Sequence, residues 1–213
     1  MSKTANTDGQ ITSVSVKIGG DRTANTDGQI SSVSATIDAG PVTESVKKER
    51  LEPTYYATKH YGHEQGLSCV FRQWRATETH CSLLHGYALG VTVVVGANSL
   101  DSRNWVFDFS NFKVLKSWLV EMFDHTVVLA QDDPQLNVFK DLDSKNLIKL
   151  KIVPAVGCEK FAELVFRKMS QILEDAKNSD PINTNEDAWV DSVTVHEHGA
   201  NSATFKEKSV QIQ

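Results

Sequence analysis

The large aromatic residues of this 213-residue chain are confined to one part of it. Seventeen Phe, Trp and Tyr residues occur, and every one lies at or beyond Tyr55. Aromatic side chains bury the most surface, so a segment without them has little to offset the entropy lost on ordering. We therefore predict a globular domain over residues 55–213 and a flexible extension over residues 1–54.

The aromatic-free segment contains a duplication with a period of 19 residues. Thr4–Arg22 reads TANTDGQITSVSVKIGGDR, and the chain from Thr23 reads TANTDGQISSVSATIDAG. Each copy joins a turn signal to alternating Ile and Val, which is typical of a short strand. Two copies are fewer than a solenoid needs. We interpret the repeat as part of the flexible extension, with docking to a larger assembly by strand pairing as the alternative.

Charge and hydropathy exclude several classes of function. The net charge of −5 and the pI near 5.8 argue against nucleic-acid binding. No apolar run approaches the roughly 18 residues of a membrane span, and no signal-peptide core is present. Cys69, Cys81 and Cys158 cannot form a closed disulfide framework, and we expect Cys69 and Cys158 to be buried. We expect a soluble, cytoplasmic protein without nucleic-acid or membrane partners.

Hydrophobic periodicity from residue 55 onward predicts strands and two amphipathic helices. Apolar residues recur at helical spacing after a Ser110 N-cap and again in a second helix. The order ββ-α-β-α-ββ predicts an α+β domain in which an antiparallel sheet carries two helices on one face. The predicted strands are Leu67–Trp74, Leu84–Val95, Leu147–Val153, Asp191–His196 and Ala203–Phe205, and the predicted helices cover 112–122 and Glu159–Leu173.

Three short polar patches carry candidate chemistry. The first is the run His80–Tyr87, in which a cysteine precedes a His-Gly pair. The second is the pair Asp124-His125 at the end of the first predicted helix, where an acid and an imidazole can form a proton relay. The third is His196-Glu197-His198, which ends a predicted strand. Each patch is weak alone, because a lone cysteine is often an inert core residue.

Together and in this order, the motifs resemble the 6-pyruvoyltetrahydropterin and 6-carboxytetrahydropterin synthases, over residues 67–205. The pieces are Cys-x3-His-Gly at Cys81–Gly86, Asp108-Phe109 opening a helix, Asp124-His125 ending it, Pro154 followed by Glu159, and Val-x-Val-x-Glu at Val193–Glu197.

The resemblance implies a tunnelling fold whose copies assemble into rings, as trimers or hexamers, with pterin sites at subunit interfaces. It implies a substrate of the 7,8-dihydroneopterin triphosphate class, from which triphosphate is eliminated. The 6-carboxy branch also releases acetaldehyde and feeds deazapurine synthesis of the queuosine type. We take a lyase of this branch as the leading hypothesis. The alternatives are the 6-pyruvoyl branch, a degenerate pterin-binding ring protein and a purely structural ring.

The resemblance also implies roles for individual residues. Cys81 corresponds to the general base, and Asp124 and His125 to the pair that exchanges protons with the substrate hydroxyl. Glu197 corresponds to the pterin anchor, since a carboxylate accepts two parallel hydrogen bonds from the ring edge. Glu159 corresponds to a second polar contact with the ring. A Cys81 base requires thiolate near neutral pH, so we expect a cation close to it.

The positions that correspond to the family's zinc ligands are altered. The family uses three histidines, but here Arg75 stands at the first position and Tyr87 at the third, leaving His85. Three interpretations follow. His80 joins His85 as a zinc ligand, with Tyr87 or water completing the shell. Arg75 instead supplies the positive charge and stabilises an oxyanion. Alternatively, the chemistry is lost and the pocket binds a pterin or purine.

The remaining histidines are expected to lie at the surface. His60 and His63 have a loose metal-like spacing but fall in a polar entry segment, which favours surface or capping roles. His196 and His198 alternate with residue 197 and so point to the opposite sheet face. We expect them to contact solvent or another subunit.

Overall fold

The computed structural model describes residues 54–207. The predicted extension and its repeat lie outside the described residues. The strands are β1 (Tyr55–Tyr61), β2 (Leu67–Phe71), β3 (His85–Ala97), β4 (Thr126–Ala130), β5 (Leu150–Val153), β6 (Trp189–His196) and β7 (Ser202–Phe205). The α-helices are α1 (Phe112–Phe123), α2 (Leu136–Ser144) and α3 (Cys158–Ser179), and the 3-10 helices are η1 (His63–Gln65), η2 (His80–Ser82) and η3 (Phe109–Asn111).

The long strand β3 organises the sheet, whose order is β5-β4-β2-β3-β6-β7. On one side β3 pairs first with β2 and then with β1, so these two strands lie end to end. Between them are η1 and Gly66, whose φ of 70° is in the region that favours glycine. β6 pairs along the other side of β3. Among residues 54–207, the outer edges of β1 and β7 have no partner strand.

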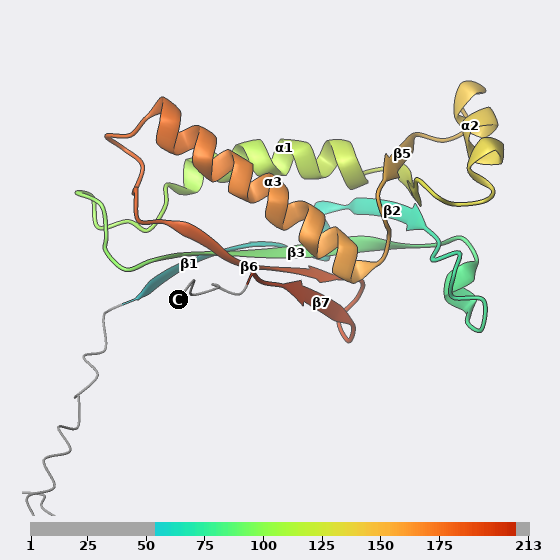
Figure 1. Ribbon diagram of the computed structural model, residues 1–213, viewed down its shortest axis with the longest axis horizontal. Helices are drawn as coiled ribbons and strands as arrows, with labels where there is room; N and C mark the ends of the chain where they lie inside the picture. The colour runs from blue at the N-terminus through green and yellow to red at the C-terminus, as the bar shows by residue number, and fades with distance from the viewer. Residues whose placement is uncertain (1–53, 208–213) are drawn as a thin grey trace, which may run out of the picture. The chain divides into compact units, whose positions relative to one another are not determined.

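Alternation along β3 explains why the helices pack on one face. Leu89, Val91, Val93 and Val95 are fully buried, because every second side chain points to the same side. Figure 1 shows α1 and α3 covering this face of the sheet. Leucines of α1 and the stripe of α3 that includes Phe161 complete the core. Burying each such side chain contributes about 1.5–3 kcal/mol.

The opposite face of the sheet carries a hydroxyl that bridges two histidines. The Thr92 Oγ1 lies 2.8 Å from His60 Nδ1 and 3.2 Å from His196 Nε2. His63 Nδ1 donates to the Ala88 carbonyl at 2.5 Å. Burial, with a contribution from the imidazoles of His60 and His63, lowers the pKa of His196.

The structure confirms the predicted α+β class and both predicted helices, and it adds three elements. β1, β4 and α2 were not predicted. β4 pairs in parallel with both β2 and β5, so the sheet is mixed rather than wholly antiparallel. Parallel neighbours need a crossover connection, which α1 supplies before β4 and α2 supplies before β5. Within residues 54–207, no helix combines the length and apolarity needed to cross a membrane.

Candidate functional site

Three of the predicted site residues line one cavity of about 430 Å³ at the end of β2. We call it the Cys81 cavity. Cys81 comes from η2, Glu159 from the first turn of α3, and Glu197 from the turn after β6. Gln73, Cys158 and residues 200–203 complete the lining. The fold therefore gathers three motifs that are far apart in the sequence.

Backbone contacts hold Cys81 at the mouth of this cavity. Its N–H donates to the Thr79 Oγ1 at 3.2 Å, which caps η2. Its carbonyl accepts from the Gln73 N–H at 2.8 Å. The residue itself is exposed. A thiol at this position is open to a ligand while its backbone is fixed on both sides.

A partly buried ion pair supports the same loop. Arg72 donates from Nε and Nη2 to the two carboxylate oxygens of Asp133, at 2.8 and 2.9 Å. Its Nη1 donates to the Ser82 carbonyl at 3.4 Å. Burial alone would raise the pKa of Asp133, but hydrogen bonds from Arg72 and the Gln135 N–H outweigh it and lower that pKa. Arg72 therefore links the loop that carries Cys81 to the turn after β4.

The Cys81 cavity is acidic. Glu159 and Glu197 are its charged residues, and no Lys or Arg of the described chain lines it. Burial, together with the negative charge of Glu197, raises the pKa of the neighbouring Tyr87. The predicted cation beside Cys81 is absent from the lining residues.

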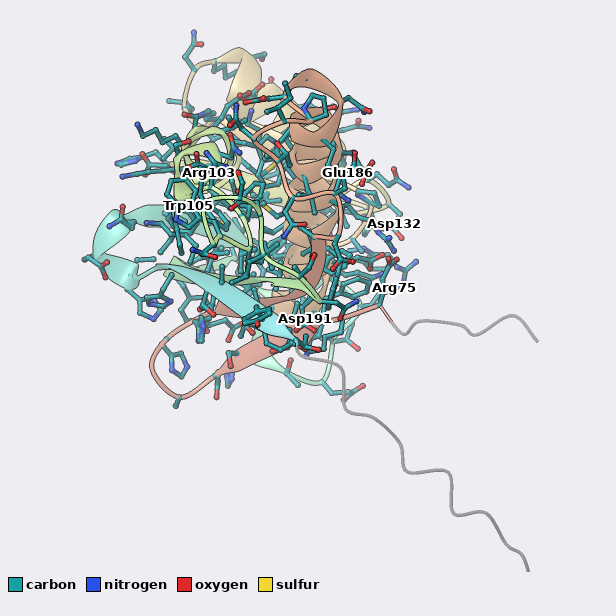
Figure 2. The ribbon with its side chains drawn as sticks, turned by 90° about the vertical axis from the view of Figure 1, so that its left-hand side faces the viewer. Arg75, Arg103, Trp105, Asp132, Glu186 and Asp191 are labelled. Atoms are coloured by element: carbon teal, nitrogen blue, oxygen red, sulfur yellow. The ribbon has the colours of Figure 1, made fainter. Side chains whose placement is uncertain are left out.

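Arg75 lies outside this cavity. Its Nη1 pairs with the Asp132 carboxylate at 2.7 Å, and its guanidinium stacks over the Trp74 ring at 4.3 Å. These residues line a separate cavity of about 360 Å³, which shares only Gln73 with the first. Figure 2 shows Arg75 and Asp132 as neighbours at one side of the molecule. The structure does not support a direct role for Arg75 at Cys81.

The two predicted metal ligands, His85 and His80, have separate surroundings. His85 donates from Nδ1 to the Leu83 carbonyl at 2.8 Å, and its ring packs 4.6 Å from the Phe71 ring. His80 is exposed in η2. Over residues 54–207, no three His, Cys, Asp or Glu side chains are grouped so that they could hold a metal ion. The described residues therefore do not fit a zinc site with three such ligands.

Asp124 and His125 form the expected pair, at a distance from Cys81. His125 Nδ1 donates to Asp124 Oδ1 at 2.6 Å, and the His125 backbone has a φ of 54°. The pair directly precedes β4, whose first residue pairs with Cys69 near the start of β2. Cys81 is hydrogen-bonded to Gln73, two residues beyond the end of β2. At about 3.3 Å per strand residue, roughly 15 Å separates the two positions.

The pair borders a cavity of its own. His125 lines a hollow of about 480 Å³ together with Asp143, Asn146 and residues 147–149. No residue is shared with the Cys81 cavity. One copy of the chain therefore carries two partial sites, one with the thiol and carboxylates and one with the acid–imidazole pair.

The structure adds cavity residues to which the sequence analysis gave no role in the site. Gln73 packs against Gly157, where a Cβ would lie 2.7 Å from its Nε2 and φ is 113°. Cys158 Sγ donates to the Val195 carbonyl at 3.2 Å. Burial, with help from Glu197, raises the pKa of Cys158 to about 11. The glycine preceding α3 was the available signal, because a residue without a Cβ lets the Gln73 side chain approach its backbone closely.

Comparison with known proteins identifies the family of this chain. Residues 58–208 match the family model described as 6-pyruvoyl tetrahydropterin synthase. The chain belongs to this family. It is 37% identical over 60 residues to the 6-carboxy-5,6,7,8-tetrahydropterin synthase of Rickettsia felis, covering 28% of this chain and 44% of that protein. It is 30% identical over 99 residues to the enzyme of that name from Aquifex aeolicus, covering 45% and 60%. The chain thus spans about half the length of these relatives.

Solved structures of similar fold cover more of the chain. An uncharacterized protein from Wolinella succinogenes superposes with a TM-score of 0.57 at 17% identity, covering 73% of this chain and 99% of that one. The 6-pyruvoyl tetrahydropterin synthase of Plasmodium vivax gives 0.50 at 16% identity, covering 72% and 98%. At these identities the likeness concerns the fold alone. The predicted tunnelling fold is confirmed.

Proposed function

We propose that this protein is a tetrahydropterin synthase-type lyase that acts on 7,8-dihydroneopterin triphosphate. The observation that carries the proposal is the Cys81 cavity, where an exposed thiol and two carboxylates meet on the fold of this family. Its volume of about 430 Å³ falls within the usual range of small-molecule sites. The names of the relatives favour the 6-carboxy branch, and thereby a place in deazapurine synthesis of the queuosine type.

The acidic lining suits the pterin ring. The ring edge presents an amino group and an N–H, both hydrogen-bond donors, and the Glu197 carboxylate can accept from both in parallel. Glu159 offers a second acceptor at the start of α3. An acidic cavity disfavours anions, so the triphosphate should extend away from it. The cavity therefore orients the substrate by charge.

The thiol of Cys81 then serves as the base. As a thiolate it takes a proton from a carbon of the substrate side chain, and the electron pair of that C–H bond expels triphosphate as its C–O bond breaks. The Asp124–His125 pair would exchange protons with the side-chain hydroxyl. Because this pair lies roughly 15 Å from Cys81 along β2, a neighbouring copy of the chain would supply it.

A ring of copies provides such a neighbour. Within residues 54–207, β1 and β7 each leave one edge without a partner strand, at opposite sides of β3 and β6. Unpaired edges are templates for pairing with another chain, and a repeated head-to-tail contact closes into a ring. We propose a homo-oligomer, trimeric or hexameric, with the pterin site between copies. The free thiols of all three cysteines are consistent with a cytoplasmic location.

A second candidate is a ring protein that binds a pterin without converting it. It is favoured by two observations on residues 54–207: no cation lines the Cys81 cavity, and no metal-ligand group is present. The zinc prediction is tested directly by elemental analysis of the purified protein. In this candidate, Glu197 retains its role and Cys81 loses its own.

Turnover separates the two candidates. The full chain is incubated with 7,8-dihydroneopterin triphosphate, with and without added zinc, while released triphosphate and product mass are measured. The lyase predicts release that Cys81→Ala reduces about 10³-fold, the size of a lost general base. Product mass separates the 6-carboxy from the 6-pyruvoyl branch. Glu78→Gln, an exposed carboxylate of the same loop, is the control. Pterin binding without release would overturn the lyase and support the binder.

A further inference from the structure

Another cavity, opposite in charge to the Cys81 cavity, lies between β1 and the start of α1. It has a volume of about 300 Å³ and is lined by Lys59, Lys113 and Lys116, with Gln65 and Phe109 at its side. We call it the lysine cavity. Lys59 projects from β1, and the other two lysines from the first half of α1. The fold therefore brings together cations that are separated by more than 50 positions in the sequence.

No acid offsets these charges. None of the three lysines forms an ion pair with a carboxylate of residues 54–207, and no Asp or Glu lines the cavity. In contrast, Lys145, Lys151 and Lys160 each have a carboxylate partner. The chain as a whole carries a charge of −5, so the local concentration of positive charge is not a consequence of composition.

The position of two of the lysines increases the electrostatic cost. Lys113 and Lys116 lie in the first five residues of α1, and the first turn of that helix contains no acidic residue. A helix start carries a partial positive charge, which favours anions there and disfavours cations. Three like charges and this dipole repel one another. An anion bound among them removes the repulsion.

We propose that the lysine cavity binds the polyphosphate group of a small molecule. Lysine ammonium groups bind phosphate as point charges, and several lysines match an anion that carries several charges. The Gln65 side chain lies at the cavity wall; its Nε2 donates one hydrogen to Glu64 Oε1 at 3.3 Å and has a second to offer. The site is separate from the Cys81 cavity, with which it shares no lining residue. The inference does not rest on the proposed lyase function.

Calorimetric titration of the full chain with inorganic triphosphate tests this site. The double variant Lys113→Gln/Lys116→Gln keeps good helix formers in α1 while it removes two charges. We expect its Kd to rise at least about 10-fold, since two charge-assisted contacts to phosphate are lost. The control Lys140→Gln/Lys168→Gln removes the same charge from α2 and α3, outside the cavity. It should leave the Kd within about 2-fold.

A third variant tests whether the lysine of β1 acts together with the two lysines of α1. Lys59→Gln alters β1 rather than α1, and it should also weaken triphosphate binding several-fold. Absence of triphosphate binding, equal losses in the control, or an unchanged Kd in Lys59→Gln would each overturn the proposal. Thermal unfolding shows that every variant is folded. Comparing inorganic triphosphate with a nucleoside triphosphate distinguishes a free anion from a larger ligand. Turnover of the pterin substrate, measured in parallel, reports on the proposed function separately.

Discussion

The Cys81 cavity and the lysine cavity are of similar size and opposite charge. The first is lined by two carboxylates and no Lys or Arg of residues 54–207, and the second by three lysines and no carboxylate. Both lie where a helix begins beside the sheet, at α3 in one case and at α1 in the other. The contrast shows that one fold can separate an acidic cavity from a basic one. A ligand that carries both a hydrogen-bond donor and an anionic group would be oriented by this separation.

The largest expected effect concerns thiol reactivity, which should set the Cys81 cavity apart from the rest of the chain. Burial raises the pKa of Cys69 from an ordinary 9.0 to about 12. At pH 8 a thiol with this pKa forms about 10³-fold less thiolate than an ordinary thiol does. Cys81 is exposed. We expect iodoacetamide to modify Cys81 first by a large margin, as followed by peptide mass spectrometry.

The thiol experiment has its own control in the denatured protein. In concentrated urea the three cysteines should react at similar rates, because burial is lost. Modification of Cys69 or Cys158 in the folded chain at the rate of Cys81 would contradict the structure.

The second prediction concerns the support beneath the Cys81 cavity. Arg72→Met leaves the buried Asp133 carboxylate without its partner, and should lower the free energy of unfolding by about 3 kcal/mol. Arg75→Met is the matched control, since its ion pair with Asp132 is exposed and worth less than about 1 kcal/mol. Urea unfolding measures both. Equal effects of the two substitutions would mean that Arg72 does not have this role.

The third prediction separates the two cavities by their ligands. Glu197→Gln replaces a charged acceptor with a neutral one, and should weaken the binding of 7,8-dihydroneopterin roughly 10–30-fold, the worth of a charge-assisted hydrogen bond. Triphosphate binding at the lysine cavity should not change. Fluorescence titration of the pterin and calorimetry of triphosphate provide the two numbers. A loss of both affinities would show that the cavities are coupled.

The smallest effect concerns Tyr61, which lies at the wall of the lysine cavity. Its hydroxyl donates to the Phe112 carbonyl at 2.8 Å, and burial raises its pKa to about 12. The folded state thus favours the neutral phenol. The associated stability is complete below pH 10 and is lost as the pH rises toward 12. We expect a loss of about 1 kcal/mol between pH 10 and pH 11.

Tyr61→Phe isolates this contribution. The variant should lose the hydrogen bond to Phe112, at about 1 kcal/mol, and show a shallower decrease in stability above pH 10. Urea unfolding at several alkaline pH values measures the slope. An identical slope in the two proteins would exclude Tyr61 as its source.

The sequence predicted the helices and the central strands because their signals are local. The 3.6-residue periodicity of α1 and α3, and the alternation in β3 and β6, each arise from one buried face. β1 was missed because most of its residues are exposed in the chain, which weakens the alternation. β4 was missed because nearly all of its residues are buried, so it shows no alternation of buried and exposed positions. The parallel pairing of β4 depends on contacts between distant segments, which no local pattern contains.

The sequence likewise predicted the Cys81 cavity better than the lysine cavity. Cys81, Glu159 and Glu197 stand in short motifs that resemble those of a known family, so the sequence indicated them. The position of Arg75 depends on Asp132, more than 50 residues later, and the sequence offered no sign of that pair. The lysine cavity was also unexpected, because its cations never form a cluster in the sequence.

The hydroxyl between two histidines on the other face of the sheet has a consequence for proton positions. Thr92 has one hydrogen to donate and two lone pairs, so when both rings are neutral at least one of the two facing ring nitrogens must carry a hydrogen. If it donates to His60 Nδ1, both rings carry hydrogen on Nε2; if it donates to His196 Nε2, both carry it on Nδ1. The two imidazoles, on strands β1 and β6, are therefore coupled, because when the facing nitrogen of one ring lacks a hydrogen, the facing nitrogen of the other ring must carry one.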